Sequence, residues 1–193
     1  MYNWVYGYMD IKNKLENKNF ILKLLNKNDF NVLYNIGKIK KIWEQHPEND
    51  RWKKEKFNIF FNKGIENKFG FYGIYNKSNS TLIGSTRYYS YSKKKKSIKI
   101  GFTFLTPEYW GSDTNLQIKT LMLGYAFNYV DNIYFDIGKN NIRSRKAIEK
   151  IGATLHLDAD IGNVLYILRF RDLKVINLGV IDEIKKNRSM EAS

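Results

Sequence analysis

The sequence predicts a mixed α/β domain that is built on one continuous β-sheet. The main observation is the order of the expected elements, which runs strand, two helices, three strands, helix, strand, helix and two strands. Hydrophobic residues make up 43% of the chain and aromatic residues 16%, so a packed core can form. At roughly 150 residues per domain, the 193 residues allow one full domain with an extra arm.

The first half of the chain predicts a strand, two helices and two further strands. A short apolar run opens it, and Asn28 with Asp29 then offers a helix cap. Apolar residues at helical spacing follow in two blocks, which are separated by a break at His46 and Pro47. The expected strands cover residues 20–25, 69–75 and 82–91, and the expected helices cover residues 30–43 and 52–65.

The second half predicts a strand and a loop, followed by helices that alternate with strands. Asn141 caps the last helix and Gly152 stops it. The loop at 106–114 leads directly into a helix at Asn115, and this is a natural anion site because first-turn N–H groups have no partner inside a helix. The expected strands cover residues 97–105, 132–137, 153–157 and 164–170, and the expected helices cover residues 115–130 and 141–151.

We expect three segments along the chain: an N-terminal arm at 1–19, a folded domain at 20–172, and a C-terminal extension or tail at 173–193. No apolar run approaches the roughly 20 residues that a membrane helix needs. The N-terminus also lacks the basic start and apolar middle of a signal peptide. We therefore expect a cytoplasmic protein without a membrane partner.

The composition excludes several classes of function. The chain has no Cys and only two His residues. This excludes a disulfide scaffold, a thiolate metal site and a cysteine nucleophile, and we expect no metal. Lys and Arg number 33 against 19 Asp and Glu, which gives a formal charge of +14. Because residues with A/T-rich codons are abundant, we attribute part of this charge to codon usage, and we do not expect a nucleic-acid partner from charge alone.

Four stretches of sequence carry a resemblance to a known family. In order along the chain they read LIGSTRYY (82–89), KIGFTFLTPEYWG (99–111), NLQIKTLMLGYAF (115–127) and NNIRSRKAIEKIGA (140–153). Together they resemble the GNAT superfamily of acyl-CoA-dependent N-acetyltransferases, and more closely its ribosomal-protein N-terminal acetyltransferase branch. The resemblance implies a single mixed, mostly antiparallel sheet with a central splay and helices on both faces. It also implies acetyl-CoA as co-substrate and a primary amine, in a protein N-terminus or a small molecule, as acceptor.

The resemblance also implies a cofactor site on the strand at 97–105 and the loop after it. The backbone at Thr103 and Leu105 would hold the pantetheine arm, and an N–H there would stabilise the negative charge that develops on the thioester oxygen. Asn141 would lie near the pantetheine arm. The pyrophosphate would bind main-chain amides of Trp110, Gly111, Ser112, Asp113, Thr114 and Asn115.

The same resemblance implies how the leaving group is protonated. Ser144 matches a hydroxyl that donates a proton to the departing CoA thiolate, and Tyr109 is the alternative donor. Each residue also has a purely structural interpretation: Asn141 can be a helix N-cap, and Ser144 can be an exposed polar residue of the helix.

Two residues depart from the family pattern. Asp113 stands where the family has a second glycine, and a carboxylate there must point outward, be neutralised, or weaken the cofactor site. Lys99 stands where many relatives carry a glutamate that takes a proton from the amine, and an ammonium cannot do this unless burial lowers its pKa strongly. The base is therefore open: Glu108 is the first candidate, and Asp136 and Glu149 are weaker ones.

Three functions stay open at this point. The first is acetyl transfer to a primary amine, directly from acetyl-CoA. The second is a catalytically degenerate member of the same fold that binds CoA or a partner, as Asp113 and Lys99 indicate. The third is a basic RNA-associated module that uses the lysines at 93–96. The acceptor and the oligomeric state are not determined by the sequence.

Overall fold

The computed structural model describes residues 9–158 and 162–173. In these residues eight strands form one sheet in the order β1-β2-β3-β4-β5-β6-β8-β7. All neighbouring strands are antiparallel except β5 and β6, so the sheet is mixed and mostly antiparallel, as expected. The strands are β1 (Lys14–Glu16), β2 (Phe20–Leu24), β3 (Phe71–Asn76), β4 (Leu82–Ser92), β5 (Ser97–Leu105), β6 (Asn132–Gly138), β7 (Thr154–Asp158) and β8 (Asn163–Arg169). The helices are α1 (Phe30–Gly37), α2 (Lys54–Ile65), α3 (Thr114–Ala126) and α4 (Ile142–Glu149).

The first expected helix is shorter than its apolar pattern. It ends at Gly37, and a separate 3₁₀ helix covers Lys40–Trp43, so the prediction of one helix over 30–43 is wrong. Two tertiary contacts explain the break. The Trp43 indole N–H donates to the Gly37 carbonyl oxygen at 2.7 Å, and a Cβ at Gly37 would lie 2.1 Å from the Phe57 ring. Packing of α1 against α2 therefore overrides helix propensity at this point.

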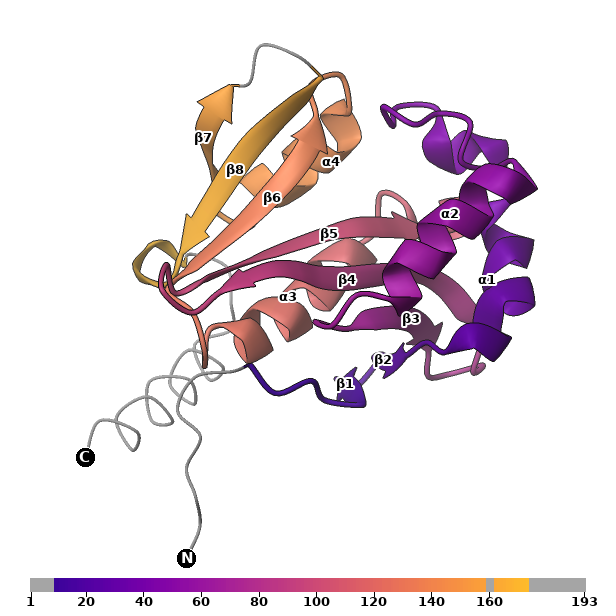
Figure 1. The fold of residues 1–193 in the computed structure, drawn as a ribbon, viewed down its shortest axis with the longest axis horizontal. Helices are drawn as coiled ribbons and strands as arrows, with labels where there is room; N and C mark the ends of the chain where they lie inside the picture. Colours follow the sequence, from indigo (N-terminus) through magenta and orange to yellow (C-terminus); the bar gives the residue numbers. More distant parts are fainter. Residues whose placement is uncertain (1–8, 159–161, 174–193) are drawn as a thin grey trace, which may run out of the picture.

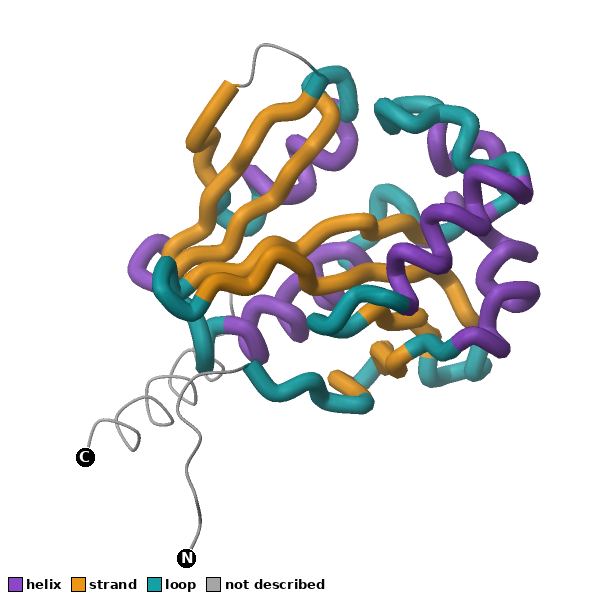
Figure 2. Tube along the Cα trace, viewed as in Figure 1, coloured by secondary structure: helices purple, strands orange, loops and turns teal. Residues whose placement is uncertain are grey.

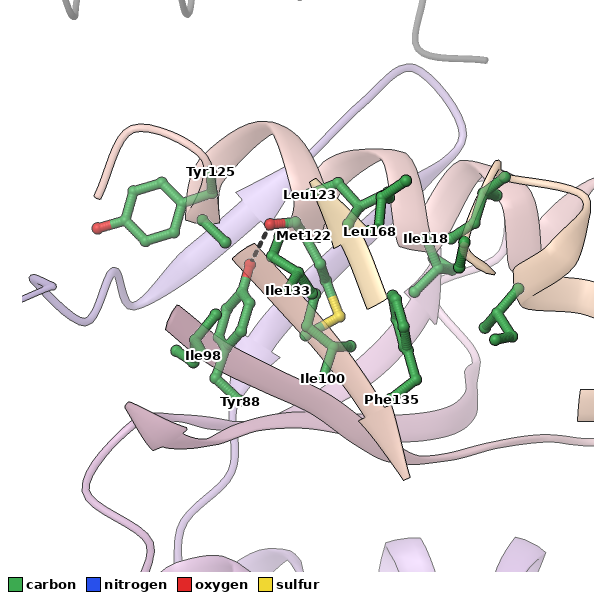
Figure 3. Close-up of a cluster of buried hydrophobic side chains, with 14 of the residues drawn as sticks. Tyr88, Ile98, Ile100, Ile118, Met122, Leu123, Tyr125, Ile133, Phe135 and Leu168 are labelled. Carbon is green, nitrogen blue, oxygen red and sulfur yellow. Dashed lines mark hydrogen bonds between the residues drawn. The ribbon is translucent and has the colours of Figure 1, made fainter. Parts of the chain in front are cut away.

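Helices cover both faces of the sheet, as Figures 1 and 2 show. Alternation along β3 demonstrates the two layers. Phe71 packs into the cluster of α1 and α2, whereas its neighbour Tyr72 packs into the larger cluster with α3. The α3 cluster contains Ile118, Met122 and Leu123, and the Tyr88 hydroxyl inside it donates to the Met122 carbonyl oxygen at 2.6 Å (Figure 3).

The sheet opens between β5 and β6. These parallel strands pair only at Ser97, Ile98 and Lys99 on β5, and then they separate. In Figure 1 the group of β6, β8 and β7 rises away from β4 and β5. This confirms the expected central splay.

The N-terminal segment adds a short strand to the sheet. Leu15 in β1 is opposite Leu22 in β2 and is buried in the α3 cluster. Residues 1–8 and nearly all of the expected C-terminal tail (174–193) lie outside the described residues. Within 9–158 and 162–173, no helix is long and apolar enough to cross a membrane.

Candidate functional site

A cavity of about 370 Å³ lies where β5 and β6 separate. One wall is formed by residues 100–105 of β5, and the opposite wall by residues 135–138 of β6 with the start of α4. The loop before α3 closes one end, and residues from the segment between α1 and α2 line another side. Strands that part in this way leave main-chain groups without a ladder partner, which a bound molecule can use.

The β5 wall carries a bulge that reshapes the strand at the cavity. Ser85 is opposite Phe104 and Arg87 is opposite Gly101, so Thr86 alone faces two residues of β5. One of these, Phe102, has φ +52°, a conformation that is uncommon for a bulky residue. Phe102 is 39% exposed and lines the cavity, and such strained positions concentrate at functional sites.

The second bulge residue, Thr103, lies in a chain of polar contacts. Its Oγ1 lies 2.7 Å from Thr86 Oγ1 and accepts a hydrogen bond of 2.7 Å from the ammonium of Lys119. Lys119 belongs to α3, lines the cavity and is 4% exposed. Burial lowers the pKa of Lys119 to about 7. Lys119 could not be identified from the sequence, because a polar residue within this helix gives no sign of which wall it faces.

The loop before α3 forms a hydrogen-bonded turn that lines the cavity. Gly111 has φ +75°, and a Cβ there would meet no atom within 4 Å, so the backbone is open to an incoming group. Ser112 Oγ donates to the Tyr109 carbonyl oxygen at 2.8 Å and accepts from the Thr114 amide at 3.3 Å. The Gln117 amide donates to the Asp113 carbonyl oxygen at 2.9 Å, and the Asn115 amide precedes it in the first turn of α3.

Asp113 is turned toward α3. Its Oδ2 accepts a hydrogen bond of 2.9 Å from Gln117 Nε2, and Gln117 Oε1 in turn accepts from Asn17 and Asn19 in the turn between β1 and β2. Asp113 is the N-cap of α3 without a side-chain cap hydrogen bond. The loop therefore accommodates the carboxylate by pairing it with a neutral amide.

The aromatic residues of this loop are already engaged. The Trp110 amide donates to the Pro107 carbonyl oxygen at 3.0 Å, and its indole N–H donates to the Leu105 carbonyl oxygen at 2.9 Å. The Arg143 guanidinium lies 3.8 Å from the centre of the Trp110 ring, which joins α4 to the loop across the cavity. The Tyr109 hydroxyl accepts from Asn76 Nδ2 at 2.9 Å, at the end of β3.

Asn141 and Ser144 both line the cavity at the start of α4. Asn141 is buried and is the N-cap of the helix, because its Oδ1 accepts from the Ser144 amide at 3.1 Å. Asn141 therefore caps the helix, and it also lies on the cavity wall. Ser144 is half-buried and lies in the first turn of the helix.

The three candidate carboxylates lie in different places. Asp136 lines the cavity on β6, where its Oδ2 lies 2.7 Å from Lys99 Nζ and 3.1 Å from the Tyr89 hydroxyl. Glu108 is exposed and lies outside the cavity lining, and local hydrogen bonds lower its pKa. Glu149 accepts a short hydrogen bond from Tyr166. Of the three, the structure brings only Asp136 to the cavity.

The segment between α1 and α2 contributes His46 and Arg51 to the cavity lining, and no sequence pattern indicates this position for either residue. Burial and the neighbouring Arg51 lower the pKa of His46 to about 4, so the imidazole is neutral at pH 7. Arg51 is 2% exposed and pairs with Glu48 at 2.8 Å, between the rings of Trp43 and Phe60. In the described ranges, no group of three His, Asp or Glu side chains could hold a metal ion.

Comparison with known proteins agrees with this geometry. A family model described as an acetyltransferase (GNAT) domain matches residues 19–154. No curated protein matches the chain at a significant level.

Several solved structures share the fold. A GCN5-related N-acetyltransferase from Brucella melitensis has a TM-score of 0.74 at 14% identity, covering 95% of this chain and 89% of that chain. A GNAT-family protein from Chromobacterium violaceum has a TM-score of 0.75 at 14% identity, covering 88% and 92%. Spermidine N-acetyltransferase from Vibrio cholerae, in complex with CoA and spermine, has a TM-score of 0.61 at 16% identity, covering 81% and 98%. The family model matches well over half of the chain, so the chain belongs to the GNAT acetyltransferase family.

Proposed function

We propose that this protein transfers the acetyl group of acetyl-CoA directly to a primary amine. The observation that carries the proposal is the separation of β5 and β6 after Lys99, which opens one cavity between the N-terminus of α3 and Asp136. The cavity lining includes helix-terminal residues whose amides suit an anion and a carboxylate that suits an ammonium. Acetyl transfer from acetyl-CoA to an amine requires both kinds of group.

The residues at the α3 end fit the cofactor of the family. The open backbone at Gly111, the Asn115 amide and the positive end of α3 would hold the pyrophosphate. The Leu105 carbonyl accepts from Trp110, and its second lone pair stays available for the pantetheine arm. Acetyl-CoA supplies the thioester whose acetyl group is transferred.

The chemistry then falls to a few groups of this chain. Asp136 would orient the amine and receive its proton, because Glu108 lies outside the cavity. Main-chain N–H groups at the β5 bulge would stabilise the charge that develops on the carbonyl oxygen. Ser144 would donate a proton to the departing sulfur. The chain has no Cys, and direct transfer needs no acyl-enzyme.

The proposal includes two classes of acceptor amine, small molecules and protein N-termini. The similar fold of a spermidine N-acetyltransferase supports a small amine, and the sequence resemblance to the ribosomal-protein branch supports a protein N-terminus. A panel that contains polyamines, amino acids, amino sugars and N-terminal peptides therefore covers both.

Two measurements on the full chain test the proposal. Calorimetric titration with acetyl-CoA measures binding, and a thiol-release assay over the amine panel measures turnover. Binding with amine-dependent thiol release is the expected result. Binding without release for every amine would favour the degenerate member of the fold, and no binding at all would contradict the cofactor assignment.

A further inference from the structure

Lys119 is a buried cation on the cavity wall that the proposed chemistry leaves without a role. It is 4% exposed, and its ammonium donates to Thr103 Oγ1 at 2.7 Å. An ammonium carries three N–H donors. Among the described residues, Thr103 is the one hydrogen-bond acceptor that the structure shows for it. Because both residues line the cavity, the remaining donors have room to meet a bound molecule.

Among the residues that the structure describes, no carboxylate forms an ion pair with Lys119. The cavity has two carboxylates: Asp113 pairs with Gln117, and Asp136 pairs with Lys99 and Tyr89. Burial is the one cause of the lowered pKa of Lys119, with no contribution from a neighbouring charge. An unpaired buried ammonium is costly, and an anion that enters the site removes that cost.

The other cations of the cavity are engaged elsewhere or exposed. Arg51 pairs with Glu48, and Arg143 stacks on Trp110 and donates to the Ile42 carbonyl oxygen at 3.1 Å. Lys146 and Lys150 are exposed on or beside α4, where solvent screens their charge. Lys119 is thus the buried cation beside Thr103, the β5 position that would hold the pantetheine arm.

We infer that Lys119 binds the CoA sulfur as a thiolate and so makes it a better leaving group. In the step, the amine lone pair forms the N–C bond while the C–S bond breaks. The electron pair of the C–S bond stays on the sulfur, and the Lys119 ammonium stabilises this thiolate until Ser144 protonates it. The proton of the amine passes to Asp136, so atoms and charge balance. A cation next to a thiol lowers the thiol pKa. This inference rests on the proposed function.

The test measures the thiol pKa of bound CoA and needs no acceptor. CoA is titrated by thiolate absorbance on the wild type and on Lys119→Met, which replaces the ammonium with an apolar side chain of similar length. We expect the bound thiol pKa to be at least about one unit lower in the wild type, which is tenfold in the ionisation equilibrium. Lys119→Arg keeps the charge and should retain part of the shift.

Two controls separate the possible outcomes. Lys146→Met removes the same charge from the cavity and should leave the thiol pKa near the wild-type value. Desulfo-CoA lacks the sulfur and should bind equally well to the wild type and to Lys119→Met. The inference is overturned if the bound thiol has the same pKa in the wild type and in Lys119→Met, or if Lys146→Met shifts that pKa as much as Lys119→Met does. Neither result contradicts CoA binding, which the proposed function requires. Failure of the wild type to bind CoA would instead contradict the proposed function.

Discussion

Lys99 on β5 and Asp136 on β6 form an ion pair of 2.7 Å at the last point where these strands are paired. Beyond it the strands separate and the cavity begins. The carboxylate at this point of the cavity wall therefore belongs to β6, the strand that faces Lys99. The Tyr89 hydroxyl also lies 3.1 Å from Asp136, and the two contacts fix the carboxylate at the cavity wall.

Replacing Asp136 with Asn should lower turnover more than any other change of a candidate base. We expect kcat/KM for the amine to fall about a hundredfold, the low end for loss of an acid–base group, with acetyl-CoA affinity unchanged. Glu108→Gln is the matched control, since this exposed residue lies outside the cavity. Steady-state kinetics of both variants decide between them, and a larger loss in Glu108→Gln would reverse the assignment.

Replacing Ser144 with Ala should lower turnover about tenfold to a hundredfold, because a serine hydroxyl is a weak acid. Acetyl-CoA affinity should barely change, since the Asn141 cap bonds the Ser144 amide and not its hydroxyl. Tyr109→Phe is the comparison, with its hydroxyl held by Asn76 at the end of β3. If Ser144→Ala turned over normally and Tyr109→Phe did not, Tyr109 would be the donor.

Replacing Asp113 with Gly should leave acetyl-CoA binding unchanged or make it tighter. The substitution removes a negative charge near the expected phosphate position, and the carboxylate bonds only to Gln117 among the contacts that the structure shows for it. Asp113→Asn removes the charge and keeps the Cβ, so it separates the two effects. Calorimetry that showed a tenfold or larger loss of affinity in Asp113→Gly would mean that the side chain builds the loop.

The stability of Lys119→Met relative to the wild type should depend on pH. The pKa of Lys119 is about 7 in the folded chain and about 10.4 in an unfolded one. Between these values the unfolded chain binds a proton that the folded chain lacks, so wild-type stability rises with pH, by up to about 1.4 kcal/mol per unit. Below pH 7 the full penalty of the buried ammonium is present. In denaturant unfolding, the gain in stability of Lys119→Met over the wild type should be largest below pH 7 and should shrink toward pH 10. A stability difference that stays constant with pH would refute the buried charge.

Much of the fold follows from local sequence patterns. Apolar alternation and helical spacing predict the strands and helices from Phe20 to Phe170 to within a few residues, because each element buries one face. Two features depend on tertiary packing instead. The break at Gly37 comes from contacts with Trp43 and Phe57, and β1 is three residues long, too short for a periodic signal.

The site is less readable from sequence than the fold. The loop at Gly111 and the cap at Asn141 have local signatures, and the structure brings both to the cavity. The pairing of Lys99 with Asp136 depends on the register of two strands that a helix separates in the chain, so spacing alone cannot show it. Lys119 is equally hidden, since its importance comes from burial beside Thr103.

Identification of the reaction product tests the central claim most directly. The wild type is incubated with isotope-labelled acetyl-CoA and each amine of the panel, and the products are analysed by mass spectrometry. The account predicts that the label appears in an amide bond on the amine nitrogen of at least one acceptor class, in amounts equal to the CoA released. Tight binding of acetyl-CoA with no labelled amide from any acceptor, or with labelled acetate alone, would contradict it.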